Sequence, residues 1–239
     1  MTALESKSPE GLPASLEIVD RPEAYWELLD RITEDKPRVG SVNLVSAPAV
    51  TGFEDVLGES LGTGFWENTP RTVHQLAFAI SISAQPTVGE FLKNKDASPR
   101  DLIKAFRDNK VLAGLKIMDL GCGKPNFALA AHALGASMYT ADINDLDLRD
   151  KRQLERHIVL NLNQPDATQI LFDGTGGNFD LITGSTVFGT PTTPKGVSRP
   201  KSKKIIDVGN TLLKEGGYLD YPLVIPDYGD KVIRKKAQA

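Results

Sequence analysis

Residues 115–143 read LKIMDLGCGKPNFALAAHALGASMYTADI, and this stretch decides the predicted fold. Its opening run, 115–120, is short, mainly apolar and followed by glycine, which is typical of a buried strand in a parallel sheet. From Asn126 apolar residues recur at helical spacing until Gly135, a common stop for a helix. A second strand is expected over 137–141. Strand, glycine turn, helix and strand in this order predict a βαβ unit with its turn at the carboxyl edge of the sheet.

The carboxyl edge of such a sheet is where a ligand is expected to bind. Loop N–H groups and the positive end of a helix converge there. Asp142 ends the second strand about 20 residues after the first glycine, the spacing at which an acidic side chain can accept the hydroxyls of a ribose. The sequence therefore predicts a nucleoside site built from the glycine turn and Asp142.

The pentapeptide DLGCG at residues 119–123 resembles the signature of class I S-adenosylmethionine-dependent methyltransferases. Asp119 would repel the diphosphate of a dinucleotide but suits a ligand with an ammonium and a sulfonium. A second match is LKEGGYL at 213–219, which is similar to the family's turn into the fifth strand. Pro125 stands where the family carries a third glycine. The alternative is a glycine turn that only packs a helix onto a strand.

The resemblance implies an α/β fold: a Rossmann-like, doubly wound, mostly parallel sheet with a mainly helical N-terminal cap before it. The C-terminal end is shorter than the family's by a helix and two strands, unless the N-terminal half supplies strands. The cofactor implied is S-adenosyl-L-methionine (SAM), and the activity is transfer of a methyl group to O, N or C of a small molecule. Two alternatives stay open: a SAM-binding partner protein without turnover, and an RNA or protein methyltransferase that uses basic segments at 189–204 and 231–236.

The implied cofactor-binding residues lie in the glycine turn and after the second, third and fourth strands: Asp119, Gly121, Cys122, Gly123, Asp142, Ile143, Asn161, Leu162, Asn163 and Ser185. In the family the loop after the third strand contacts adenine. Asn161 or Asn163 would bond to the adenine edge while Leu162 covers its face, although the asparagines would serve equally well to cap the loop. Cys122 is read as a small residue that fills a tight turn, with a reactive thiol as the alternative. Ser185 is also a candidate for orienting the substrate.

Spacing alone identifies no histidine paired with a carboxylate. His74, Tyr221 and His157 are the candidate catalytic residues, each as a general base. A histidine at the surface or the core edge is the alternative for His74. Displacement at a sulfonium requires no metal, and no metal site is predicted.

We expect three regions along the chain: a loose tail over 1–14, a helical cap on the substrate side over 15–110, and the SAM-binding domain over 111–239. Within the cap, helices are predicted over 22–32 and 70–82, and from Thr87 and Ser98 onward. An edge strand or loop is expected over 39–50 and a mobile flap over 58–68. Residues 189–204 are predicted to be a loop, and 218–235 a hairpin.

Composition limits the classes of function. A chain of 239 residues with 40% hydrophobic content can bury a core in one large or two modest domains. A net charge of −3 gives no overall attraction to nucleic acid or to an anionic membrane. The single cysteine excludes an intrachain disulfide and favours a reducing cytoplasm. We therefore predict a cytoplasmic protein that has no membrane span and is not expected to bind nucleic acid. The small-molecule substrate is what the resemblance implies, and a homodimer is left open.

Overall fold

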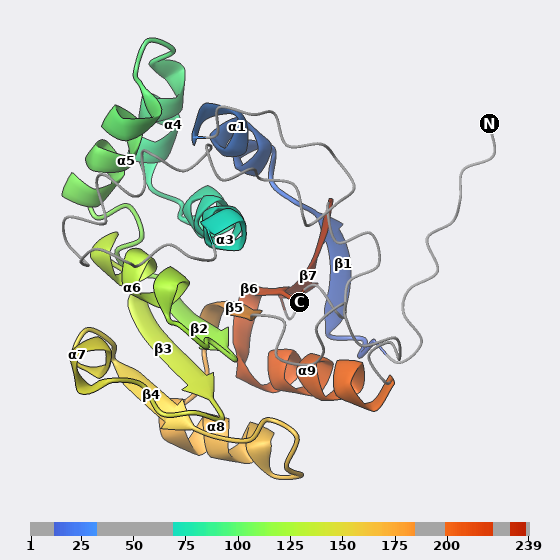
Figure 1. Cartoon of the computed structure of the whole chain (residues 1–239). Helices are drawn as coiled ribbons and strands as arrows, with labels where there is room; N and C mark the ends of the chain where they lie inside the picture. Colours follow the sequence, from blue (N-terminus) through green and yellow to red (C-terminus); the bar gives the residue numbers. More distant parts are fainter. Residues whose placement is uncertain (1–11, 33–68, 185–198, 222–229, 238–239) are drawn as a thin grey trace.

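The computed structural model describes residues 12–32, 69–184, 199–221 and 230–237 (Figure 1). Their centre is a seven-stranded sheet in the order β1-β7-β6-β5-β2-β3-β4. The strands are β1 (Leu16–Asp20), β2 (Lys116–Leu120), β3 (Ser137–Asp142), β4 (Arg156–Val159), β5 (Phe179–Gly184), β6 (Leu213–Asp220) and β7 (Lys231–Lys235). Strands β6, β5, β2, β3 and β4, which are neighbours in this order, run parallel to one another. Strand β7 runs antiparallel to both of its neighbours, β1 and β6. The predicted doubly wound, mostly parallel sheet is confirmed.

The first and the last described strands lie side by side in this sheet. β1 pairs antiparallel with β7, from Leu16 opposite Lys235 to Asp20 opposite Lys231, and Figure 1 shows the blue and red strands together. Sequence analysis placed residues 16–20 in a helical cap and predicted no strand there. The N-terminal half thus supplies one strand of the sheet. The predicted hairpin is confirmed in its pairing, because Tyr218 lies opposite Arg234 and Leu219 opposite Ile233.

Helices cover both faces of the sheet. They are α1 (Glu23–Ile32), α3 (Thr69–Ile82), α4 (Pro86–Lys93), α5 (Pro99–Asp108), α6 (Asn126–Ala133), α7 (Leu148–Lys151), α8 (Ala167–Thr175) and α9 (Arg199–Leu212). The side chains of α1, α3 and α6 share one hydrophobic cluster with Ile117 and Leu181 of the sheet. Those of α8 and α9 share a second cluster with Met118 and Ile182. Successive residues of a strand point to opposite faces, so each strand contributes to both cores.

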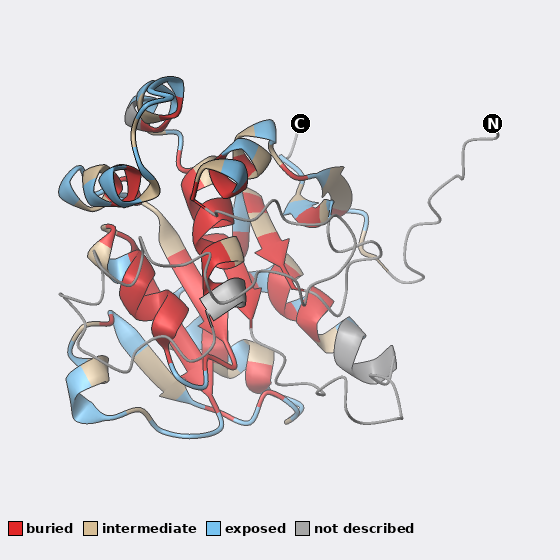
Figure 2. Cartoon of the chain, turned by 45° about the horizontal axis from the view of Figure 1, so that its top comes forward, coloured by how far each residue is buried: buried red, intermediate tan, exposed pale blue. Residues whose placement is uncertain are grey.

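Helix α3 lies against the face of the sheet, so it is more than a cap over the edge. Phe78 packs edge to face on Tyr218 of β6, with ring centroids 5.6 Å apart. Figure 2 shows that α3 and α6 are the most buried helices on this side. Phe78 and its neighbours on α3 are fully buried, so this helix contributes to the core that supports the sheet. The predicted boundary between the helical cap and the SAM-binding domain, near residue 110, stays a prediction.

Local signals located several helix ends correctly. The Ser98 hydroxyl accepts a hydrogen bond from the Asp101 N–H over 3.2 Å, which confirms the predicted cap of α5. Thr87 was predicted to begin α4, but the helix begins at Pro86 with Gln85 as its cap. Residues 199–204 belong to α9 and not to a loop. The predicted segments at 39–50 and 58–68 lie outside the described residues.

Among the described helices, none has the length and apolar content that crossing a membrane requires.

Candidate functional site

The glycine turn follows β2 directly. Gly121 and Gly123 have φ angles of +67° and +52°, a region that favours glycine because it has no Cβ. The Gly121 N–H donates to the Ala141 carbonyl over 2.6 Å, which ties the turn to β3. A Cβ atom built on Gly123 would meet no atom of the described residues within 4 Å. At this point of the turn a ligand could therefore approach the backbone closely.

Asp142 at the end of β3 is buried and bound to the turn. Its Oδ2 accepts from the Gly123 N–H over 2.9 Å, and its Oδ1 accepts from the backbone and side-chain nitrogens of Asn144 over 2.9 and 3.3 Å. A carboxylate has about four acceptor positions, so one position on Oδ2 remains. Asp142 can thus accept one ribose hydroxyl as it stands. To accept both hydroxyls it would have to exchange the longer contact to Asn144.

Five polar side chains form a row across the sheet near the carboxyl ends of its strands. Asp119 of β2 lies opposite Thr140 of β3 on one side and Thr183 of β5 on the other. Thr140 lies opposite His157 of β4, and Thr183 lies opposite Asp220 of β6. Residues in register point to the same face, which here is the face covered by α3 and α6. We call these five residues the polar row. Buried polar groups are costly unless they are hydrogen-bonded, so we treat the polar row as part of the candidate site.

His157 at one end of the polar row is held by internal hydrogen bonds. Its Nδ1 is 2.8 Å from the Thr140 hydroxyl, and its Nε2 is 3.1 Å from the Asn144 carbonyl. A carbonyl only accepts, so Nε2 carries a proton, and in the neutral ring Nδ1 then accepts from Thr140. Both ring nitrogens are occupied, which leaves His157 no free atom to take a proton from a substrate. Its contacts hold the loop that carries Asn144 and so support Asp142.

Cys122 is buried between two carboxylates of the site. Burial raises the pKa of its thiol above the ordinary value, and the charges of Asp119 and Asp142 raise it further. The thiolate is the nucleophilic form of cysteine, and these surroundings disfavour it. The geometry thus favours the interpretation of Cys122 as a small residue that fills the turn.

The other end of the polar row is bound to the N-terminal helices. Gln75 of α3 donates from Nε2 to the Thr183 hydroxyl over 2.8 Å. Arg21 donates to both carboxylate oxygens of Asp220, over 2.7 and 3.2 Å, and both side chains are only 2% exposed. The Arg21 guanidinium also lies 4.9 Å from the ring centroid of Tyr25. Sequence analysis missed these contacts, because each joins segments far apart in the chain.

His74 lies beside this group of residues. Its Nδ1 is 2.7 Å from the Tyr25 hydroxyl. Burial lowers the pKa of His74 to about 4, and the Arg21 charge adds to this effect while Asp220 opposes it. The imidazole is therefore neutral near pH 7. It sits next to Gln75 in α3, on the side of the sheet where β5 and β6 end.

The loop after β4 only partly matches its predicted role. Asn161 accepts from the Asn163 N–H over 3.0 Å, so it caps its own loop, which was the alternative interpretation. Leu162 is buried in the hydrophobic cluster on the α8 and α9 face. Ile143 is 57% exposed next to Asp142, and Val159, which lies opposite Asp142, is also exposed. Both apolar side chains thus lie beside Asp142, and sequence analysis did not single out Val159.

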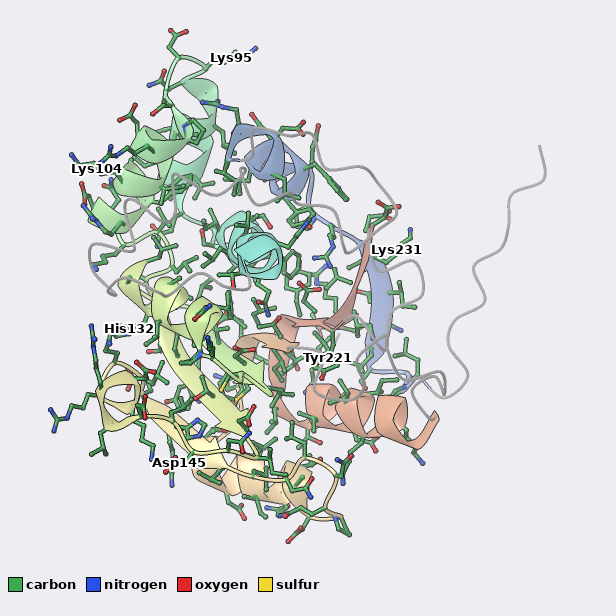
Figure 3. The ribbon with its side chains drawn as sticks, viewed as in Figure 1. Lys95, Lys104, His132, Asp145, Tyr221 and Lys231 are labelled. Carbon is green, nitrogen blue, oxygen red and sulfur yellow. The ribbon has the colours of Figure 1, made fainter. Side chains whose placement is uncertain are left out.

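Tyr221 is fully buried, and its ring lies where a Cβ on Gly184 would have to stand. Figure 3 shows Tyr221 in the interior beside α9, whereas His132 lies at the outer side of α6. This burial fits a packing role for Tyr221 better than proton transfer. Ser185, the last predicted cofactor residue, lies outside the described part of the chain.

Comparisons with known proteins add a weak likeness of fold. No family model and no curated protein matches the chain. Eight chains of solved structures match it. One is the crystal structure of SMU.776, a proposed methyltransferase complexed with S-adenosylhomocysteine (SAH), at 18% identity and a TM-score of 0.36. Another is a proposed SAM-dependent methyltransferase from Streptococcus mutans, at 19% identity and a TM-score of 0.33.

Each alignment covers 50% of this chain and 33% of the solved one, so the chain spans about a third of each of those proteins. Similarity at this level assigns no activity. The function is therefore argued from the residues of the site itself.

Proposed function

We propose that this chain is a SAM-dependent methyltransferase acting on O, N or C of a small molecule. The observation that carries the proposal is the hydrogen bond from the Gly123 N–H to Asp142 Oδ2. It brings the glycine turn and the acidic end of the next strand together at one edge of a doubly wound sheet, where ligands of such sheets bind. The described residues leave space beside the Cα of Gly123, so a ligand could approach the turn there.

The acidic side chains at this edge of the sheet fit the cofactor. Asp142 has an acceptor position left for a ribose hydroxyl, and Asp119 provides negative charge on the same face for a cationic group. When bound, SAM supplies an electrophilic methyl group on its sulfonium. The protein's part is to hold the methyl acceptor in line, and such positioning can contribute roughly 7 to 11 kcal/mol. Thr183 lies opposite Asp119 in the sheet and accepts a hydrogen bond from Gln75, so these two side chains are suited to that task.

The C-terminal lysines favour a small molecule over RNA as the substrate. Lys231 forms an ion pair with Asp20. Lys235 donates from Nζ to the carbonyls of Asn210 and Leu213 over 2.7 and 2.8 Å. Lys235 therefore serves the fold and Lys231 is already paired, whereas phosphate contacts are made by lysines and arginines that are available to the nucleic acid.

Two measurements test this proposal. Calorimetry should detect binding of SAM and SAH to the full chain, and absence of binding would overturn the assignment. Incubation with SAM labelled in the methyl group and a metabolite extract should then transfer label to a small molecule. Label in RNA or protein would favour the macromolecular alternative, and binding without transfer would favour the partner protein without turnover. RNA binding that weakens with salt would support the RNA substrate.

A further inference from the structure

His74 and Tyr25 form a pair whose proton positions follow from burial. Tyr25 is 2% exposed, and its hydroxyl lies 2.7 Å from His74 Nδ1. Within the described ranges, neither side chain makes another hydrogen bond. The direction of this one hydrogen bond therefore determines which atoms carry the protons in both side chains.

The phenol is the donor in this hydrogen bond. Burial raises the pKa of Tyr25 above its ordinary value, so its hydroxyl keeps its proton. A buried O–H needs an acceptor, and His74 Nδ1 is the one it reaches. If Nδ1 were protonated instead, the phenol proton would be left without an acceptor among these residues. A neutral imidazole with its lone pair on Nδ1 carries its proton on Nε2.

The charged form of His74 is disfavoured by its surroundings. Burial lowers its pKa to about 4, and the guanidinium of Arg21 acts in the same direction. Asp220 acts in the opposite direction but is itself bound to Arg21 by two hydrogen bonds. Near pH 7 the ring is therefore neutral, with Nε2–H on the side away from Tyr25.

His74 lies near the end of the polar row formed by Thr183 and Asp220. The next residue, Gln75, bonds to Thr183, and Phe78 one turn further along α3 packs on Tyr218 of β6. The start of α3 thus lies over the carboxyl ends of β5 and β6. His74 keeps part of its surface exposed there.

We propose that His74 is a fixed hydrogen-bond donor that binds an acceptor oxygen of the substrate through Nε2–H, and that it is not the general base of the reaction. This inference rests on the proposed function and narrows its substrate class. The methyl acceptor carries a carbonyl, carboxylate, phosphate or ether oxygen near the atom that is methylated. Tyr25 is the positioning residue, because it fixes the tautomer of His74.

Nitrogen-15 NMR of the histidine-labelled full chain tests the donor assignment without turnover. The chain has three histidines, so His132→Gln and His157→Gln variants assign the signals. We expect His74 to show a protonated Nε2 and an unprotonated Nδ1 from about pH 5 to 8. Tyr25→Phe should convert this signal to a mixture of tautomers. A protonated Nδ1, or an imidazolium at pH 7, would overturn the proposal.

Kinetics with the acceptor found by label transfer test the role in binding. His74→Gln keeps an N–H donor and should stay within about threefold of wild type, whereas His74→Leu should raise KM about tenfold or more with a smaller change in kcat. His132→Gln, at an exposed position of α6, is the control. Equal loss of kcat in both His74 variants would identify a base and reject the proposal. If the wild type transfers no label, the proposed function fails, while the NMR result still decides the tautomer.

Discussion

Arg21 and Asp220 lie 199 residues apart in the sequence and form a buried ion pair with two hydrogen bonds. Asp220 ends β6, and Arg21 follows β1 directly. This pair therefore fastens the N-terminal segment to the edge of the sheet where the candidate site lies. The guanidinium also lies over the rings of Tyr25 and Phe78, so it connects the ion pair to the core.

Breaking this pair from one side should destabilise the fold strongly. Arg21→Met leaves the Asp220 carboxylate buried without its main partner, and we expect a loss of about 3 to 5 kcal/mol in the free energy of unfolding. The double variant Arg21→Met/Asp220→Leu should recover most of that loss. Urea denaturation measures both. Asp20→Asn, which removes the exposed ion pair with Lys231, is the control and should change little. If Arg21→Met lowered the free energy of unfolding no more than Asp20→Asn does, the expectation would be contradicted.

Asp142→Ala should weaken SAM binding while the protein stays folded. The variant removes a charged acceptor of hydrogen bonds, which corresponds to roughly 10- to 100-fold in affinity. Calorimetry measures the affinity, and circular dichroism checks the fold. Asp145→Ala removes a nearby exposed carboxylate that is paired with Lys151 and should bind SAM like the wild type. Unchanged affinity of Asp142→Ala would reject the ribose assignment.

Gly123→Ala and Gly176→Ala form a matched pair. Both glycines have positive φ, +52° and +70°, and in both a new Cβ would meet no atom of the described residues within 4 Å. Each variant should lose about 1 to 2 kcal/mol of stability from backbone strain. Only Gly123→Ala should also weaken SAM binding, because its methyl group would occupy space in front of the turn. Equal affinity of the two variants for SAM would show that the ligand does not approach Gly123.

Acidification should destabilise the protein through His74. Its pKa is about 4 in the folded chain, against an ordinary histidine value of 6.5, so the unfolded chain binds the additional proton between these values. The contribution to stability is complete above about pH 6.5 and falls as the pH is lowered toward 4. At pH 5 the loss is about 2 kcal/mol. The groups that face His74 are Tyr25, Arg21 and Asp220.

Urea denaturation of wild type and His74→Gln at pH 7 and pH 5 measures this effect. The variant has no imidazole at this position, so it should lose less stability between the two pH values. Parallel losses in the two proteins would show that His74 does not resist protonation.

The parts of the fold that were predictable depend on residues close in sequence. The strand before Gly121, the turn, α6 and Asp142 follow one another within 28 residues of chain, and each step has a local signal. The Ser98 cap is likewise a contact over three residues. Side-chain size, charge and periodicity are sufficient for such elements.

The polar row was not predictable in this way. Asp119, Thr183 and Asp220 come from three separate strands, and only the register of the sheet makes them neighbours. Each one alone resembles an ordinary polar residue at a strand end. The strand at 16–20 was missed for a related reason, because its partner is more than 200 residues away in the chain.

The pairing of β1 with β7 has a consequence for biosynthesis. Residues 16–20 leave the ribosome early, yet Leu16 pairs with Lys235 and has to wait until that residue has been translated. Until then the nascent chain carries a short strand with unpaired backbone groups, which invites contact with other chains. We therefore expect this protein to complete its sheet only after residue 235 has been translated, and to depend on chaperones during synthesis more than a chain whose neighbouring strands are made consecutively.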